Sequence, residues 1–514
     1  MASRGWAAGA LAAGALALAF GSTAAQAPGL VEREASPEPS GTQAARSLTE
    51  CRVAGLPRAV LCGAVRRPLD PRHPEGIRID IHYVVVPALA RRKRPDPVFL
   101  LAGGPGQSAI SLAPAVMPLF ARLHNRRDIV FVDQRGTGRS APLDCAEADR
   151  APLSDASDPD RQLAQLADCR KRLEGLPQVG GAEGLRHYTT SVAMQDLDAV
   201  RAALGAEQID LVGASYGTRA ALEYLRRFPG AVRRVVLDGA VPPDMVLPAS
   251  HSTDAQAALD TVFAACAAEA ACARRHPSLR ADWQAVLASL PRTVTLPDPR
   301  SGVSEPVRMT RERVLGAVRG PLYVPALAAA LPAAIEAAAH GRFEALAGLA
   351  ALFTTRRQEA RLAMGMHFAV VCAEDVPPLA TAIDPPGRDF GTELARFYER
   401  ACADWPRGEV PAGFYSMPPS AAPVLVLSGG LDPATPPRHG RRVVEALGPM
   451  ARHIVVANAG HGLMGIGCLA DVLHRFIDVA DDRAALAVDA GCAAGIPKPP
   501  AFEPIAAASA PEVR

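Results

Sequence analysis

The sequence carries little net charge and few aromatic side chains for its length of 514 residues. Its 55 lysines and arginines nearly balance its 53 aspartates and glutamates, and Phe, Trp and Tyr make up 5% of the chain. No basic patch with interleaved aromatic residues occurs, so we do not expect nucleic acid as a partner. The one dense basic run, Arg91–Arg94, lies between two strand-like segments, and we interpret it as a solvated hairpin tip.

Beyond its N-terminus the chain also lacks an apolar run long enough to span a bilayer, so we expect no stable membrane insertion of the mature protein. The first residues have the three parts of a signal peptide: the positive Arg4, the short apolar run Leu11–Phe20 and the small-residue motif Ala25–Ala27. A membrane anchor is the less favoured interpretation, because that apolar run is short and rich in alanine. We therefore predict export, to the periplasm or the medium, with a signal peptide at 1–27 and a loose leader at 28–47.

Zinc-binding cysteine motifs are missing as well. There is no C-x-x-C and no cysteine-histidine cluster, so we expect neither a metal nor a cofactor. Ten cysteines in an exported chain instead indicate disulfides. Many pairings are possible, and the simplest joins neighbours in the sequence: Cys51–Cys62, Cys145–Cys169, Cys266–Cys272, Cys372–Cys402 and Cys468–Cys492.

In the first half of the chain, short β-rich runs alternate with helical patterns. Ile77–Val86, Val98–Leu101 and Asp128–Val132 read as strands, and residues 141–186 read as polar and irregular. A helix predicted at Ser191–Leu204 leads into further strands. Such alternation predicts a mostly parallel sheet covered by helices on both faces.

After Asp238 the alternation stops, and only helical patterns follow until strand signals resume at Pro423–Ser428 and His453–Val456. The intervening stretch is either a separate helical domain or a helical lid inserted into the sheet domain. We favour the lid, because the sheet pattern restarts after it. The predicted organisation is a signal peptide (1–27), a leader (28–47), the first part of the core (48–245), the helical lid (246–415), the second part of the core (416–495) and a C-terminal tail (496–514).

A candidate catalytic motif lies at Gly213–Gly217, where the sequence G-x-S-x-G stands between a strand pattern and a helix pattern. This is the nucleophile elbow, in which a serine sits on a strained turn with its Oγ above the sheet. Its neighbours two residues before and after must lack a side chain. Ser215 is therefore the predicted nucleophile.

A serine nucleophile needs a base and an acid that orients the base. In the order Ser, Asp, His, both should follow the serine on loops after later strands. Asp432 lies on the loop after the strand near residue 424, and His461 on the loop after the strand near residue 453. We predict Asp432 as the acid and His461 as the base; a turn-forming aspartate and a plain loop histidine are the alternatives.

The oxyanion hole should combine the Tyr216 amide with amides after the strand at Val98–Leu101. Gly103 and Gly104 are placed for this, because amides of residues without side chains can turn inward. Asp133 and Arg135 follow the next strand, and we interpret them as scaffold of the pocket.

These motifs together resemble the α/β-hydrolase-fold serine peptidases of the prolyl aminopeptidase and exported tripeptidyl aminopeptidase family. The resemblance covers about residues 60 to 495 and implies an α/β-hydrolase fold with a peptidase activity. Ala102 departs from the histidine usual in prolyl aminopeptidases, which weakens any expectation of strict N-terminal proline specificity. The matching runs are Gly103–Gly106, Asp133–Ser140, Tyr188–Thr190, Asp196–Asp198, Gly213–Thr218, Leu237–Gly239 and Gly460–Gly462, followed by Cys468 and Cys492.

The resemblance also implies that acidic lid residues hold the ammonium group of a substrate N-terminus. Glu374 and Asp375 are the candidates here, with a solvated acidic turn as the alternative. The predicted function is an exported serine exopeptidase that removes short peptides or single residues from free N-termini. An esterase or amidase for small substrates is the nearest alternative, and a catalytically silent binding protein is disfavoured because all three triad residues are present. The length of the released fragment, the residue preference and the oligomeric state stay open.

Overall fold

The computed structural model describes residues 48–145, 159–298, 302–359 and 362–502. The predicted signal peptide and leader lie outside the described residues, as does the tail beyond residue 502. Within the described ranges, no helix has the length and hydrophobicity needed to cross a membrane.

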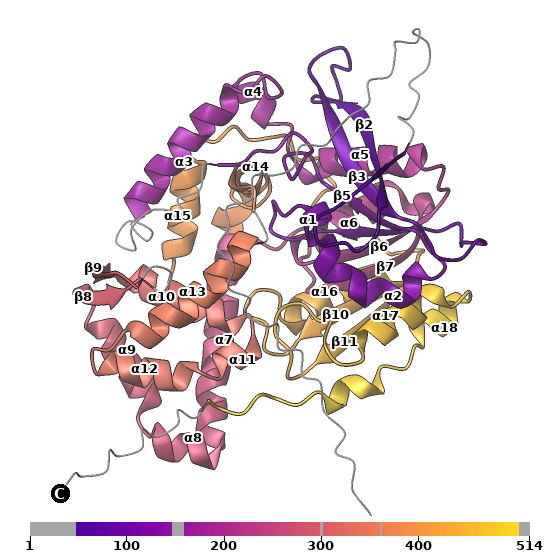
Figure 1. The fold of residues 1–514 in the computed structure, drawn as a ribbon. Coiled ribbons are helices and arrows are strands. Elements are labelled where there is room, and N and C mark those ends of the chain that lie inside the picture. Colours follow the sequence, from indigo (N-terminus) through magenta and orange to yellow (C-terminus); the bar gives the residue numbers. More distant parts are fainter. Residues whose placement is uncertain (1–47, 146–158, 299–301, 360–361, 503–514) are drawn as a thin grey trace, which may run out of the picture. The chain divides into compact units, whose positions relative to one another are not determined.

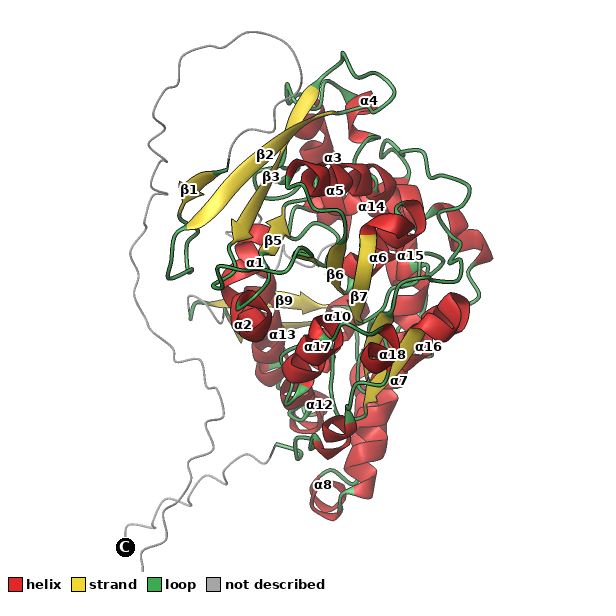
Figure 2. Ribbon diagram, turned by 90° about the vertical axis from the view of Figure 1, so that its right-hand side faces the viewer, coloured by secondary structure: helices red, strands yellow, loops and turns green. Residues whose placement is uncertain are grey.

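A sheet of nine described strands, ordered β1-β2-β3-β5-β4-β6-β7-β10-β11, forms the centre of the fold (Figure 1). Neighbours from β5 to β11 are parallel, whereas β1, β2 and β3 are antiparallel and form one edge. The long β2–β3 hairpin extends from that edge in Figure 2. The bounds are β1 Thr49–Cys51, β2 Val60–Pro68, β3 Arg78–Val86, β4 Val98–Leu101, β5 Ile129–Val132, β6 Ile209–Ala214, β7 Val232–Asp238, β10 Val424–Gly429 and β11 Ala451–Val456.

The central strands are buried on both faces, because helices cover both sides of the sheet. Alternate residues of β6 enter different cores: Leu211 packs in one hydrophobic cluster and Val212 in the other. The Leu211 side is covered by α5 (Thr190–Ala203), α6 (Tyr216–Arg227) and α16 (Pro437–Leu447), and the Val212 side by α1 (Ala109–Val116) and α17 (Leu469–Asp478). This is the fold predicted from the alternation of strands and helices.

Between β7 and β10 lies a long segment, residues 239–423, called the insertion here. Most of it packs around its own core, which includes Leu259, Trp283 and Val314. It is not purely helical: the described part contains a hairpin of β8 and β9 that the sequence patterns did not reveal. Its elements are α7 Leu247–Ala268, α8 Ala270–Arg275, α9 Leu279–Ala288, β8 Arg292–Pro297, β9 Ser304–Met309, α10 Arg311–Leu322, α11 Pro325–Ala328, α12 Leu331–Ala339, α13 Glu344–Glu359, α14 Met364–Glu374 and α15 Glu393–Cys402.

One helix corrects the expectation of an irregular segment at 141–186. Helix α3 spans Pro159–Glu174 and buries Leu166, Cys169 and Leu173, a narrow apolar stripe on an otherwise polar helix. The remaining short helices are α2 Ala121–His124, α4 Ala182–Leu185, α18 Asp482–Leu486 and the 3-10 turns at Met117–Phe120, Pro229–Ala231, Pro377–Thr381, Gly448–Met450 and Gly491–Gly495.

All ten cysteines are described, and they form five disulfides between sequence neighbours. The bonds are Cys51–Cys62, Cys145–Cys169, Cys266–Cys272, Cys372–Cys402 and Cys468–Cys492. A chain with this many disulfides fits a protein outside the reducing cytoplasm.

Candidate active site

Ser215 lies on the sharp turn between β6 and α6. Its backbone has φ 54° and ψ −124°, which a non-glycine residue rarely adopts and which tertiary contacts must hold. A β-carbon on Gly213 would lie 2.5 Å from the Gly217 carbonyl oxygen, and one on Gly217 would collide with the carbonyl of Leu101. The spacing G-x-S-x-G is therefore a requirement of close backbone packing around the serine.

Asp432 lies on the loop after β10 and is fixed by three hydrogen bonds from its own loop. The amides of Ala434 and Thr435 donate to its Oδ1 at 2.8 and 2.9 Å, and the Thr435 hydroxyl donates to Oδ2 at 2.6 Å. Burial opposes ionisation, but the attraction of His461 and these hydrogen bonds outweigh it and lower the pKa of Asp432. The carboxylate is therefore held charged and in one orientation.

His461 lies on the loop after β11, with Nδ1 at 2.8 Å from Asp432 Oδ2. Because the carboxylate only accepts, Nδ1 carries the proton and Nε2 keeps a free lone pair. Burial lowers the pKa of His461, but the charge and hydrogen bond of Asp432 dominate, and the net pKa is raised. The ring of His461 packs beside Gly239. The preceding residue, Asp238, accepts a hydrogen bond from the Ser215 amide through its backbone carbonyl at 2.8 Å.

The insertion contributes a second support for the histidine that sequence patterns did not indicate. The His461 amide donates to the carbonyl of Tyr323 at 3.0 Å, and the two rings meet edge to face with centroids 5.2 Å apart. Arg319 in turn donates to the Tyr323 hydroxyl at 2.9 Å. A side chain on Gly460 would collide with the Tyr323 carbonyl, so a glycine before His461 is the only local signal of this contact.

The amides of Gly103, Gly104 and Tyr216 lie around the serine. A β-carbon on Gly103 would lie 3.2 Å from Ser215 Cβ, so the loop after β4 lies against Ser215. In the described part of the chain, none of the three amides donates to a carbonyl or a side chain. Tyr216 also begins α6, where the helix dipole favours negative charge. The arrangement can bind an oxyanion formed next to Ser215.

The loop that carries Gly103 and Gly104 is held from two sides. On the core side, Asp133 accepts from the Ser108 hydroxyl at 2.6 Å and from the amides of Ile110 and Arg139. Arg135 pairs with Asp196 at 2.7 and 3.0 Å and is fully buried. Asp133 therefore holds this loop, whereas the hydrogen-bond partners of Arg135 lie on other segments of the chain.

On the other side, α14 of the insertion holds the same loop. The Ala363 amide donates to the Gly106 carbonyl at 2.9 Å, and Leu362 forms an antiparallel bridge with Gln107. His367 Nδ1 lies 3.3 Å from the Pro105 carbonyl.

A family model described as "alpha/beta hydrolase fold" matches residues 96–292, and one described as "TAP-like protein" matches residues 388–482. Serine protease Hip1 of Mycobacterium tuberculosis is 30% identical over 431 residues, which cover 76% of this chain and 81% of that protein. The chain belongs to the α/β-hydrolase serine peptidases.

Two further relatives match parts of this peptidase. A tripeptidyl aminopeptidase of Streptomyces lividans is 35% identical over 199 residues, covering 37% of this chain and 36% of that protein. Carboxylesterase B of Mycobacterium tuberculosis is 32% identical over 236 residues, covering 42% and 43%. The protein is therefore an enzyme, a serine hydrolase of the peptidase type.

In this peptidase Glu374 and Asp375, the predicted anchor for a substrate amine, end helix α14 and are 1% and 0% exposed. They do not form the solvated turn considered as the alternative. Asp375 pairs with Arg219 of α6 through two hydrogen bonds of 3.0 Å. Glu374 accepts from the amide and hydroxyl of Thr190 at 2.7 and 2.9 Å. Burial raises the pKa of Glu374 to about 7, although Arg219 and these hydrogen bonds oppose the rise.

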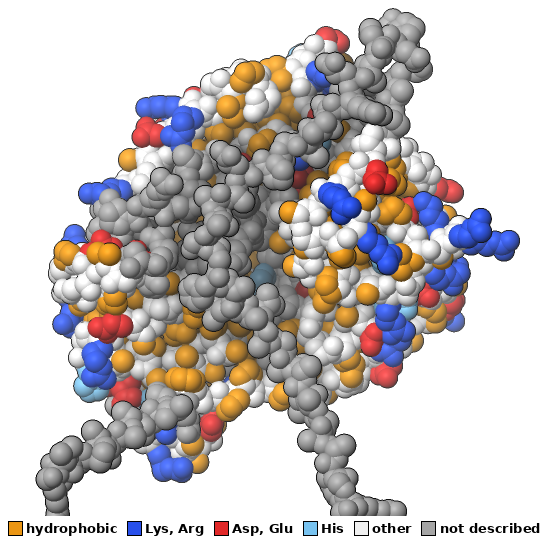
Figure 3. Space-filling model, viewed as in Figure 1, with side chains coloured by type: hydrophobic (Ala, Val, Ile, Leu, Met, Phe, Trp, Pro, Cys, Tyr) orange, Lys and Arg blue, Asp and Glu red, His pale blue; other side chains and the backbone are white. Residues whose placement is uncertain are grey.

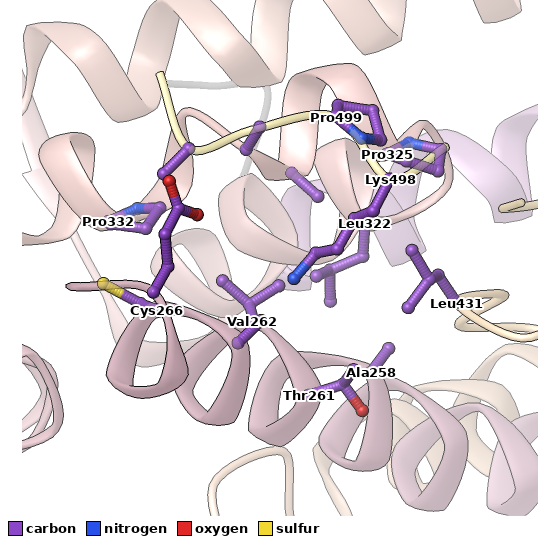
Figure 4. A pocket seen from close by; sticks show the side chains of 15 residues that line it. Ala258, Thr261, Val262, Cys266, Leu322, Pro325, Pro332, Leu431, Lys498 and Pro499 are labelled. Atoms are coloured by element: carbon purple, nitrogen blue, oxygen red, sulfur yellow. The ribbon is translucent and has the colours of Figure 1, made fainter. Parts of the chain in front are cut away.

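A hollow that is partly open to solvent is lined by other residues and by neither of these carboxylates (Figure 4). Its largely apolar wall comes from α7, α10 to α12 and the C-terminal segment, and Leu431, the neighbour of Asp432, closes one end. On the face in Figure 3, hydrophobic side chains gather over α11 and α12, while basic and acidic ones are interspersed elsewhere. Within the described residues, no group of three or more metal-ligating side chains comes together.

Proposed function

We propose that the protein is an exported serine exopeptidase that removes short peptides or single residues from free N-termini. Ser215 is the nucleophile, His461 the general base and Asp432 the residue that orients it. The observation that carries the proposal is the 2.8 Å hydrogen bond between Asp432 and His461, at the strand ends beside the strained Ser215. The names of the relatives, a serine protease and a tripeptidyl aminopeptidase, support the choice of a peptide substrate.

The chemistry follows from the roles of these groups. His461 Nε2 takes the proton of Ser215 Oγ as the oxygen attacks the scissile carbonyl carbon, and Asp432 stabilises the imidazolium that forms. The carbonyl oxygen becomes an oxyanion facing the amides of Gly103, Gly104 and Tyr216. Collapse breaks the C–N bond, and His461 returns the proton to the leaving amine. Water then repeats the sequence on the acyl-enzyme and releases the peptide acid.

Selection for a free N-terminus needs negative charge that a substrate ammonium can complete. Glu374, Asp375 and Arg219 supply two carboxylates against one guanidinium, and burial raises the pKa of Glu374 to about 7 although Arg219 lies 3.8 Å away. Both carboxylates are closed off from solvent in this conformation. Direct contact with a substrate ammonium group therefore requires the residues around them to move. The assignment of Glu374 and Asp375 as the anchor is part of the proposal.

Export is supported by the signal-peptide pattern at 1–27 and by the five disulfides, which a reducing cytoplasm would not maintain.

A panel of chromogenic substrates tests the proposal: aminoacyl, dipeptidyl and tripeptidyl anilides, their N-acetylated forms, and p-nitrophenyl acetate. We expect Ser215→Ala to lose turnover by about 10⁴-fold or more on every substrate while its melting temperature is unchanged. N-acetylation should lower kcat/KM about ten- to hundredfold, because a charge-assisted contact contributes roughly 1.5–3 kcal/mol. Glu374→Gln should reproduce that loss on the free amine and spare the blocked substrate.

An esterase is the second candidate, favoured by the similarity to carboxylesterase B. An esterase has no reason to distinguish free from acetylated N-termini. Equal rates on both peptide forms, together with faster turnover of the acetate ester, would replace the exopeptidase with an esterase and leave the triad in place.

A further inference from the structure

Gln107 is a polar residue beside the nucleophile that the triad chemistry leaves without a role. It follows the Gly103–Gly106 loop and precedes the first residue of α1 by two positions. The position that a β-carbon on Gly103 would occupy lies 3.0 Å from Gln107 Oε1 and 3.2 Å from Ser215 Cβ. The carboxamide and the nucleophile therefore border the same small space above Gly103.

The backbone of Gln107 is fixed from both sides. Its amide donates to the Gly103 carbonyl at 3.3 Å, and its strand-like bridge with Leu362 ties it to the insertion. The next residue, Ser108, caps α1 and donates to the buried Asp133. Gln107 is thus held on a rigid loop, which is the condition for placing a side chain accurately beside a reacting atom.

The side chain of Gln107, in contrast, is not used inside the protein. It is only partly buried, and within the described ranges its carboxamide has no hydrogen-bond partner. Its oxygen and nitrogen are exchanged by rotation about the last bond, and no internal hydrogen bond fixes one choice. The carboxamide of Gln107 therefore lies beside Ser215 without an internal hydrogen bond, and it is available to bind a substrate.

We propose that Gln107 donates a hydrogen bond from Nε2 to the oxyanion that forms when Ser215 attacks the scissile carbonyl. It thereby adds a side-chain donor to the amides of Gly103, Gly104 and Tyr216. A carboxamide N–H has the strength of a backbone amide, and the bond becomes charge-assisted only when the carbonyl oxygen acquires negative charge. Such a contact stabilises the transition state more than the bound substrate, so it acts on kcat. The inference rests on the proposed role of Ser215.

The test compares Gln107→Ala and Gln107→Met on a free tripeptidyl anilide and on p-nitrophenyl acetate. Methionine retains the length and packing of glutamine without an N–H. We expect kcat to fall roughly a hundredfold in both variants and on both substrates, because both pass through an oxyanion, with KM within about threefold of wild type. Gln208→Ala is the matched control, since that exposed carboxamide donates to the Gly230 carbonyl near the opposite end of β6; it should leave kcat unchanged.

Each other outcome overturns the inference. Normal activity in Gln107→Met with loss only in Gln107→Ala would mean that glutamine acts by packing. A rise in KM, or a loss confined to the peptide, would mean that Gln107 contacts the peptide chain. Ser215→Ala distinguishes failure of the proposed function from failure of the role of Gln107. If Ser215→Ala stays active, the proposed function fails. If Ser215→Ala is inactive while both Gln107 variants match wild type, only the role of Gln107 fails.

Discussion

At the scale of single residues, His461 lies under opposing electrostatic influences. Burial disfavours its charged form, whereas Asp432, assisted by Asp238, favours it. The pKa of Asp238 is itself raised to about 6, because its complete burial outweighs the amides of Leu463 and Met464 that donate to it. The balance raises the pKa of His461 above its ordinary value of 6.5, which gives a stronger base that also binds a proton at a higher pH.

The pH dependence of kcat/KM follows from that balance. A general base works only when neutral, so activity should fall as the pH drops through the raised pKa of His461, with a midpoint above 6.5. Asp432→Asn should move the midpoint to lower pH, because the favourable charge is gone. It should also reduce kcat by roughly 10⁴-fold, because the imidazole loses the acceptor that fixes its tautomer. Initial rates on a tripeptidyl anilide from pH 5 to 9 measure both effects.

Asp471→Asn is the control for loss of one negative charge. That aspartate is exposed and pairs with Arg122 away from His461, so both midpoint and kcat should match wild type. A flat profile between pH 5 and 8, or an unshifted midpoint in Asp432→Asn, would contradict the assignment of His461 as the base.

Ser215, Asp432 and His461 could be proposed as a triad from sequence because each follows a strand whose end is marked by glycines. Thr435 and Tyr323 could not be proposed in this way. The hydroxyl of Thr435 lies 2.6 Å from Asp432 and 3.1 Å from His461 Nδ1, but a threonine three residues after an aspartate also occurs in ordinary turns. The Tyr323 contact uses a backbone carbonyl, which any residue type supplies.

At the scale of elements, α14 connects two parts of the candidate active site. Its first turn contacts the Gly103–Gly106 loop, and its last residues pair with Arg219 on the elbow helix. The Arg219–Asp375 pair is completely buried, with both side chains 0% exposed. Removing one partner of such a pair leaves an uncompensated charge in the interior.

Breaking this pair should therefore destabilise the protein strongly. We expect Asp375→Asn to lower the free energy of unfolding by about 3–5 kcal/mol, because the buried Arg219 loses both 3.0 Å hydrogen bonds to a carboxylate and retains only the more distant Glu374 at 3.8 Å. Glu393→Ala is the matched control: it removes a carboxylate from an ion pair with Arg396 in which the side chains are 44% and 66% exposed, and it should cost less than about 1 kcal/mol. Urea unfolding of both variants measures the difference. Equal midpoints would mean that the buried pair does not brace α6 against α14.

The same scale shows where sequence patterns succeed and fail. Val98–Leu101 and Asp128–Val132 were predictable, since a continuous apolar run bounded by turns is typical of a strand buried on both faces. Helix α3 was missed because its apolar stripe is narrow within a polar segment. The β8–β9 hairpin was missed because β8 buries only Leu296 and Pro297 is exposed, so the pattern of a half-buried strand is faint.

At the scale of the whole molecule, each disulfide joins two segments that are close in sequence. Sequence separations run from 6 to 30 residues, and each bond joins elements that are consecutive or nearly so, such as α14 and α15. Local closure is why pairing of sequence neighbours was the correct choice. The pairing of Asp375 with Arg219 had no such signal, because it joins residues 156 positions apart.

Thiol titration tests the redox state that this pattern implies. Protein purified from an oxidising compartment and denatured without reductant should show no free thiol, because all ten cysteines are bonded. The same sample after reduction should show all ten, which calibrates the assay. Mostly free thiols in the first sample would contradict both the disulfides and the proposed export.

The hydrogen bond between the His461 amide and the Tyr323 carbonyl has a consequence for divergence and engineering. Segments that connect the elements of a fold vary among homologues, tolerate insertions and often carry function, so the insertion invites exchange between homologues. Here that exchange cannot be modular, because the transplanted segment must bring a main-chain carbonyl to the same point above Gly460, where no side chain fits. A chimera that keeps residues 319–325 of this chain retains the hydrogen bond that supports His461. A chimera that replaces the whole insertion has to supply an equivalent carbonyl.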